Sequence, residues 1–275
     1  MITLRVLTVT DLHQSCALGE QLLCAVQTHR PDVVAVVGDV LGLAEEHAGR
    51  FTTWAWARFL ADLPVEHLVF TRGNHDQEEW GNFVYAWPHE KRPLIALHGT
   101  AHAFGPLVVV GFPCHVGWEG PWRARLPKVG NVVTLDPKQS GRKSLPGKTS
   151  RWLRPLLRGL GPAGRTLWLM HEPPLAAPIA YSRTCNPEWT AVVAKHQPLL
   201  TISGHDHDTP RRTARWHMRL GESFCVNVGQ GVETLHYTLT EFTFPTETTC
   251  LPTRIVVCAF PAGDQIEINP VNLVP

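Results

Sequence analysis

Residues 33–39 read VVAVVGD, five consecutive apolar residues that end on a glycine and an aspartate. A strand buried on both faces reads as such a continuous run, whereas a strand with one solvated face alternates. Residues 4–10 and 68–70 give two further short apolar stretches. Helical spacing of apolar residues at 17–29 and 51–62 separates them. This alternation predicts βαβ units and a parallel sheet.

In the second predicted helix, the face expected to be buried carries Phe51, Trp54, Ala55 and Phe59. Beyond residue 90 the apolar runs become shorter. They predict strands at 107–111, 166–170 and 199–203, then hairpins built from 224–228, 236–244, 254–260 and 265–268. No internal repeat is evident. We therefore expect one α/β domain over 1–275, with a Gly-, Pro- and Lys-rich loop or cap at about 113–160.

Net charge is +1 over 275 residues, so no global electrostatic partner is indicated. The charge is unevenly distributed, because residues 121–158 carry ten Lys or Arg and one acid. That segment is +9, which leaves −8 for the remainder. It is either a solvated surface loop or a basic rim that attracts an anionic substrate. Its Arg142 and Lys143, together with His115, are the candidate substrate-binding residues.

The chain contains seven cysteines, an odd number, and no two are spaced as Cys-x-x-Cys. This favours reduced thiols in a cytoplasmic protein over a disulfide framework or a thiolate zinc site. The N-terminal stretch lacks the features of a signal peptide. No run of 18 apolar residues occurs, so we expect no membrane partner.

Short polar clusters follow five of the apolar runs. They are Asp11-Leu12-His13, Gly38-Asp39, Gly73-Asn74-His75-Asp76, His171 and Gly204-His205-Asp206-His207. In α/β sheets, sites form at the carboxyl ends of strands, so these clusters are expected to converge. In an extended chain, residues two apart point the same way. Each Asp-x-His or His-x-His pair can then face metal together.

The donors are carboxylates, imidazoles and one amide oxygen, without thiolate. This set suits Mn²⁺, Fe²⁺ or Zn²⁺, and Mn²⁺ is our first expectation. Two ions sit about 3.5–4 Å apart in two-metal sites, which requires a bridging carboxylate. Asp39 is the natural bridge, because it is the lone ligand in its cluster. Asp206 and Asp208 are either additional ligands, groups that support the ligands from behind, or part of a solvated turn, and we favour the turn.

In this order, the five clusters resemble the calcineurin-like metallophosphoesterase family. The resemblance implies a four-layer α/β/β/α sandwich, with two mixed β-sheets flanked by helices. It implies seven metal ligands around two ions, with Asp39 shared: Asp11, His13, Asp39 and His207 for the first, and Asp39, Asn74, His171 and His205 for the second. It also implies that His75 is the protonated histidine near the leaving group and that Asp76 orients it.

The activity implied is hydrolysis of phosphate esters by a hydroxide that bridges the two metals. No tyrosine lies three residues after Asp39, which argues against a ferric purple acid phosphatase site. No Asp-Arg-Gly follows it either, which argues against the protein Ser/Thr phosphatases. We expect a phosphodiesterase or phosphatase acting on a small, nucleotide-like substrate. The alternatives are a nuclease of the same fold, acting on single-stranded or end-exposed nucleic acid, and a non-enzymatic interaction protein.

Overall fold

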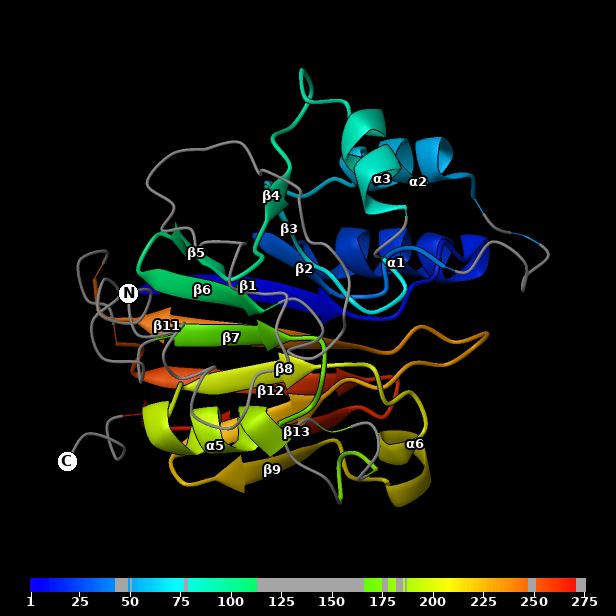
Figure 1. Ribbon diagram of the computed structural model, residues 1–275. Helices are drawn as coiled ribbons and strands as arrows, with labels where there is room; N and C mark the ends of the chain where they lie inside the picture. The colour runs from blue at the N-terminus through cyan, green and yellow to red at the C-terminus, as the bar shows by residue number, and fades with distance from the viewer. Residues whose placement is uncertain are drawn as a thin grey trace.

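The computed structural model describes residues 1–42, 49, 51–76, 79–112, 166–174, 178–181, 185, 187–246 and 251–270. Two mixed β-sheets face each other within them (Figure 1). The first has seven strands in the order β13-β12-β11-β1-β2-β3-β4. Their bounds are β1 (Ile2–Val9), β2 (Val33–Val37), β3 (His67–Thr71), β4 (Ile95–Ala96), β11 (Tyr237–Phe244), β12 (Arg254–Phe260) and β13 (Asp264–Ile268).

The second sheet has six strands in the order β5-β6-β7-β8-β10-β9. Their bounds are β5 (Thr100–Phe104), β6 (Leu107–Phe112), β7 (Thr166–Met170), β8 (Leu200–Ser203), β9 (His217–Leu220) and β10 (Ser223–Asn227). Parallel pairing joins β1–β4, which form one end of the first sheet, and β6, β7, β8 and β10, which form the middle of the second.

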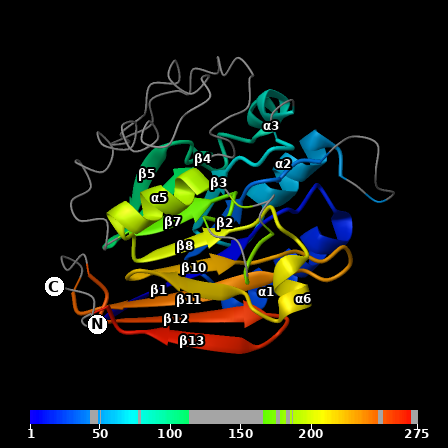
Figure 2. The same cartoon turned by 60° about the horizontal axis from the view of Figure 1, so that its bottom comes forward.

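Helices cover the outer face of each sheet (Figure 2). The first sheet is covered by α1 (Cys16–His29), α2 (Thr53–Ala61) and α3 (Trp80–Ala86). On the second sheet lies α5 (Pro187–His196), and the five-residue α6 (Thr209–Thr213) follows β8. Apart from α1 and α2, these helices were not predicted. α3 and α6 are too short to show a helical period.

The buried side chains form three layers of core between four layers of structure. In β2, Val34 and Val36 pack beneath the helices of the first sheet, whereas Ala35 packs between the two sheets. In β7, Leu169 belongs to the same inter-sheet core and Trp168 packs with α5. Because successive strand residues point to opposite faces, both strands are buried on both sides. This confirms the predicted four-layer sandwich.

Two local predictions were wrong. The buried residues of α2 include Trp56, Ala57 and Leu60, whereas Trp54 is 52% exposed. Phe51 precedes the helix and stacks on the Trp56 ring with centroids 5.4 Å apart, which fixes how the chain enters the helix. Of the predicted face, Phe51 and Phe59 do pack against the core but are only partly buried, so the buried face is rotated from the predicted one.

The stretches 224–228 and 236–244 were also expected to form a hairpin. Instead, β10 pairs with β8 and β9 in the second sheet, and β11 pairs with β1 and β12 in the first. The connection at 228–236 therefore crosses between sheets. The hairpins β11–β12 and β12–β13 are present as predicted.

The predicted basic loop or cap at 113–160 lies outside the described residues. So do its substrate-binding candidates His115, Arg142 and Lys143. Whether the chain forms one domain over 1–275 therefore remains a prediction. None of the helices in the described part of the chain has the length and apolar character needed to cross a bilayer.

Candidate metal centre

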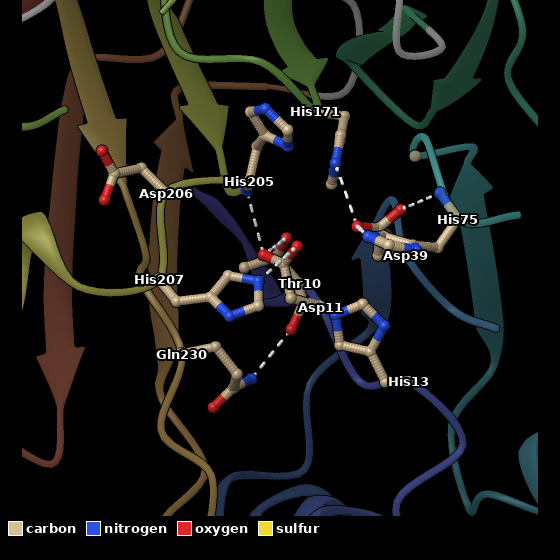
Figure 3. Close-up of polar contacts among 12 residues, drawn as sticks. Thr10, Asp11, His13, Asp39, His75, His171, His205, Asp206, His207 and Gln230 are labelled. Atoms are coloured by element: carbon tan, nitrogen blue, oxygen red, sulfur yellow. Dashed lines mark hydrogen bonds and ion pairs between the residues drawn. The ribbon is translucent and has the colours of Figure 1, made fainter. Parts of the chain in front are cut away.

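The predicted polar clusters meet where the two sheets face each other (Figure 3). Asp11, Asp39 and the 73–76 turn follow the parallel strands β1, β2 and β3 of the first sheet. His171 and the 204–207 turn follow β7 and β8 of the second. The site is therefore built from residues at the carboxyl ends of parallel strands in both sheets, and neither sheet forms it alone.

Three side chains form the first group: Asp11, His13 and His207. One donor atom from each lies within 4.8 Å of the others. His207 Nε2 is 3.1 Å from Asp11 Oδ1. That carboxylate oxygen is buried and has no aligned hydrogen bond within the described residues. A buried carboxylate is unfavourable unless a positive charge balances it, and a divalent cation held by these three donors would supply that charge.

The second group contains Asp39, His171 and His205, with one donor atom each within 4.8 Å. Asp39 Oδ2 lies 3.4 Å from His171 Nε2. Asn74 also reaches this group, because its Oδ1 is 3.0 Å from the same ring nitrogen. His205 and His207 are thus divided between the two groups. All seven predicted ligands are brought together here, and their binding to metal remains a proposal.

The backbone at these residues differs from the extended conformation assumed from sequence. Asp11 has φ of 53°, His13 47°, Asp39 46° and His205 64°. Left-handed backbone is uncommon outside glycine, although Asp and His adopt it more often than most residues. Here it is stabilised by bonds between the loops, since Asp11 N donates to Gly38 O at 3.0 Å and His13 N to Asp39 O at 3.0 Å.

Two of the polar clusters contain a glycine at a position where neighbouring atoms leave no room for a side chain. A Cβ at Gly73 would overlap Asp39 Oδ1, and a Cβ at Gly204 would overlap Thr10 Oγ1. The first contact packs two loops of the first sheet together, and the second brings a loop of the second sheet against the end of β1.

Each group contains a carboxylate paired with an imidazole. Burial alone would raise the pKa of Asp11 and Asp39, but the imidazoles around them outweigh burial and lower both. Burial works in the opposite direction on His171. The charge of Asp39 overcomes it and raises the pKa of His171 to about 10. The pKa of His207 is likewise raised, because Asp11 outweighs the effect of burial.

These shifts predict that metal binding releases protons. With its pKa near 10, His171 carries a proton at neutral pH, and a histidine must be neutral to bind a metal ion. Apparent metal affinity should therefore rise with pH, by about tenfold per unit for each displaced proton. Titration calorimetry in buffers of different ionisation enthalpy measures this release. Binding heats that do not depend on the buffer would contradict it.

His75 lies at the edge of the site. Its ring centroid is 5.2 Å from that of His13, and the side chain is 32% exposed. Its backbone N donates to Asp39 Oδ1 at 2.8 Å, while Nε2 is 3.9 Å from Asp39 Oδ2. The ring is therefore positioned beside the proposed bridging carboxylate and is accessible from outside.

Asp76, which the family resemblance implies orients His75, directs its carboxylate to backbone groups. Its carboxylate accepts from the backbone N–H groups of Leu41 and Gly73, each at 2.7 Å. Burial, followed by the charge of Asp39, raises the pKa of Asp76 to about 7. Asp76 therefore ties together two loops that carry proposed ligands, which is an indirect way to place His75.

The prediction that Asp206 lies in a solvated turn is wrong. It is buried and points away from the metal ligands (Figure 3). Its carboxylate accepts from Tyr181 N at 2.7 Å and from Thr209 N at 2.9 Å, so it anchors the loop between its two histidine neighbours. Asp208 is exposed and pairs with Arg211 at 2.7 Å, as a solvated turn residue would.

Two polar residues beside the ligands were missed. Thr10 Oγ1 lies 2.5 Å from Asp11 Oδ2 and 2.8 Å from Val37 O. Gln230 is 4% exposed and donates from Nε2 to Thr10 O at 2.8 Å. The adjacency of Thr10 to the first ligand was the only available signal. No signal in the sequence pointed to Gln230, because it lies 220 residues along the chain from its partner Thr10.

Comparison with models of known protein families shows which family the chain belongs to. The model of the calcineurin-like phosphoesterase family matches residues 4–209, which include all the residues of the two groups. The chain belongs to this family of phosphoesterases. The comparison with curated protein sequences found no match.

Solved structures share the fold at low sequence identity. TT1561 of Thermus thermophilus is 14% identical, with a TM-score of 0.58 over 98% of this chain and 100% of that one. A dimetal phosphatase from Danio rerio is also 14% identical, with a TM-score of 0.58 over 97% and 98%. GAP50, the anchor in the inner membrane complex of Plasmodium, is 10% identical, with a TM-score of 0.53 over 98% and 89%. Because the fold includes an anchor as well as a phosphatase, function must be argued from side chains.

Proposed function

We propose that the protein is a metal-dependent hydrolase of phosphate esters, a phosphodiesterase or phosphatase acting on a nucleotide-like small molecule. The observation that carries this proposal is the pair of adjacent Asp–His groups, of which each places three donor atoms within 4.8 Å. One group would be a common surface or structural feature. Two such groups side by side, with the buried carboxylate of Asp39 proposed as their bridge, are the arrangement that two-metal hydrolysis requires.

The proposed ligands of the first ion are Asp11, His13, Asp39 and His207, and those of the second are Asp39, Asn74, His171 and His205. Imidazole, carboxylate and amide ligands suit Mn²⁺, with Fe²⁺ or Zn²⁺ as alternatives. When bound, the two ions would supply an activated water and positive charge for the phosphoryl oxygens. The buried position of Asp39 suits it to hold both.

The remaining chemistry belongs to the protein. His75 is partly exposed and lies beside Asp39, so it can donate a proton to the departing oxygen. The hydrogen bond from His75 N to Asp39 Oδ1 holds the backbone of residue 75 at the site. Asp76 supports this placement through Gly73 and Leu41.

A nuclease of the same fold is the second candidate, and the +9 charge of residues 121–158 favours it. A non-enzymatic role is disfavoured by the complete donor set, since an anchor does not need buried imidazoles around a carboxylate.

We place the protein in the cytoplasm. The five cysteines in the described part of the chain are free, which suits a reducing compartment.

The proposal is tested with purified protein and a panel of phosphate monoesters, diesters and cyclic nucleotides, assayed with Mn²⁺. We expect hydrolysis of nitrophenyl phosphate esters and faster hydrolysis of at least one nucleotide. Chelation should abolish both activities, and Mn²⁺ should restore them. Absence of metal-dependent hydrolysis of every ester would overturn the proposal.

Salt dependence separates the nuclease from the nucleotide hydrolase. Binding of single strands weakens with salt by a log–log slope of about −0.7 per contacted phosphate. We expect a shallow slope, because a small nucleotide engages few cations. A slope steeper than about −3 with oligonucleotides indicates four or more contacts. That slope, flattened by Arg142→Ala with Lys143→Ala, would make the nuclease the better assignment.

A further inference from the structure

Gln230 lies on the connection that crosses from β10 to β11, beyond the residues matched by the family model. The side chain is 4% exposed. Its Oε1 accepts from Gly231 N and from His236 N, each at 2.9 Å. These two bonds fix which end of the amide is oxygen, and therefore direct the Nε2 donor towards Thr10 (Figure 3).

The Nε2 donor holds the peptide group that precedes the first ligand. It donates to Thr10 O at 2.8 Å, while Asp11 N, at the other end of the same peptide, donates to Gly38 O at 3.0 Å. This peptide is thus held at both ends. Asp11 has a φ of 53°, and such a conformation is unfavourable by about 1 kcal/mol or more outside glycine. Without the bond from Gln230, this peptide could rotate and turn the Asp11 carboxylate away.

Gln230 also contacts the opposite side of the same metal group. Its backbone N donates to His207 O at 3.3 Å. Asp11 follows a strand of the first sheet and His207 follows a strand of the second. Gln230 therefore joins the two loops that the first group depends on. Among the described residues, none of its hydrogen bonds goes to the second group, namely Asp39, Asn74, His171 and His205. That group meets this network through the bond from His205 N to Asp11 Oδ2 at 3.0 Å.

We propose that Gln230 is a positioning residue that selectively maintains the first cation site, formed by Asp11, His13 and His207. This proposal rests on the proposed function, because it takes these residues to be metal ligands. It predicts an unequal effect: loss of the Nε2 donor weakens the first site and leaves the second nearly unchanged. A general packing role would weaken both sites or neither.

The test measures Mn²⁺ affinity by titration calorimetry in two backgrounds. His205→Gln leaves the first site intact, and His207→Gln leaves the second. Gln230→Met keeps the length of the side chain and removes its donor and acceptor. In the first background it should weaken binding by about 10- to 100-fold, the usual effect of losing a residue that supports a ligand. In the second background the change should stay within about threefold.

Gln197→Met is the matched control. Gln197 also joins two segments, since its Oε1 accepts from Glu222 N at 2.5 Å and its Nε2 donates to Ala194 O at 2.5 Å. We expect this variant to lower Tm without changing either affinity. If Gln230→Met fails to fold, Gln230→Glu retains the acceptor and should show the same selectivity at pH 8.

Equal weakening of both sites, or unchanged affinity at the first, would overturn the role of Gln230. If neither single-site background binds Mn²⁺, while wild type also fails to bind it, the proposed function itself has failed. The two failures are therefore distinguishable in one set of titrations.

Discussion

Asp39→Asn should remove both metal ions from the protein. Asp39 is 1% exposed, and its Oδ2 lies 3.4 Å from His171 Nε2 in the second group. The charge of Asp39 also acts on His13 and His207 in the first group. The proposed bridging role of Asp39 predicts that a single substitution affects both sites. Metal content should fall from two ions per chain to fewer than one. Activity at limiting Mn²⁺ should fall by about 10³-fold or more, corresponding to about 4 kcal/mol.

Asparagine is well suited to this test. It has the size of aspartate and tolerates the left-handed region, so the φ of 46° at residue 39 need not change. Asp206→Asn is the control, since this buried carboxylate lies between two proposed ligands and points away from them (Figure 3). It should lower Tm and retain the metals. Elemental analysis that finds two ions in Asp39→Asn would rule out the bridge.

The sequence predicts the site's composition better than its geometry. The apolar run Val33–Val37 is buried along its whole length, as expected, and it delivers Asp39 to the sheet edge. Each other polar cluster also follows a strand. These features depend on local pattern, which a sequence displays directly. The left-handed backbone at Asp11 depends on bonds with Gly38 and, through Thr10, with Gln230. Local pattern carries no signal for such distant partners.

The same limit explains Asp76 and the missed strand crossing. The family resemblance implies that Asp76 orients His75, but it does not show that the turn directs the Asp76 carboxylate to Gly73 N and Leu41 N. Likewise, β10 and β11 are consecutive strands, which favoured a hairpin. Their registers place them in separate sheets, and the connection between them carries Gln230 into the site.

His75→Gln should keep both metals and lose about 10²–10⁴-fold in rate, the usual size of a general acid–base contribution. The bond that positions residue 75 comes from its backbone N, at 2.8 Å from Asp39 Oδ1, so it survives the substitution. Glutamine still forms hydrogen bonds, but it cannot deliver a proton. The loss in rate then reports proton transfer and not altered metal binding.

The leaving group distinguishes an acid from a merely structural residue. Nitrophenolate departs with little need for a proton, whereas the alkoxide of a nucleoside needs one. The loss for His75→Gln should therefore be much smaller for nitrophenyl esters than for nucleotides. His67→Gln serves as the control, because His67 begins β3 at the end opposite the 73–76 turn and pairs with Glu66 at 3.3 Å. It should leave both rates unchanged. Equal losses for the two leaving groups would show that His75 supports the site without acting as the acid.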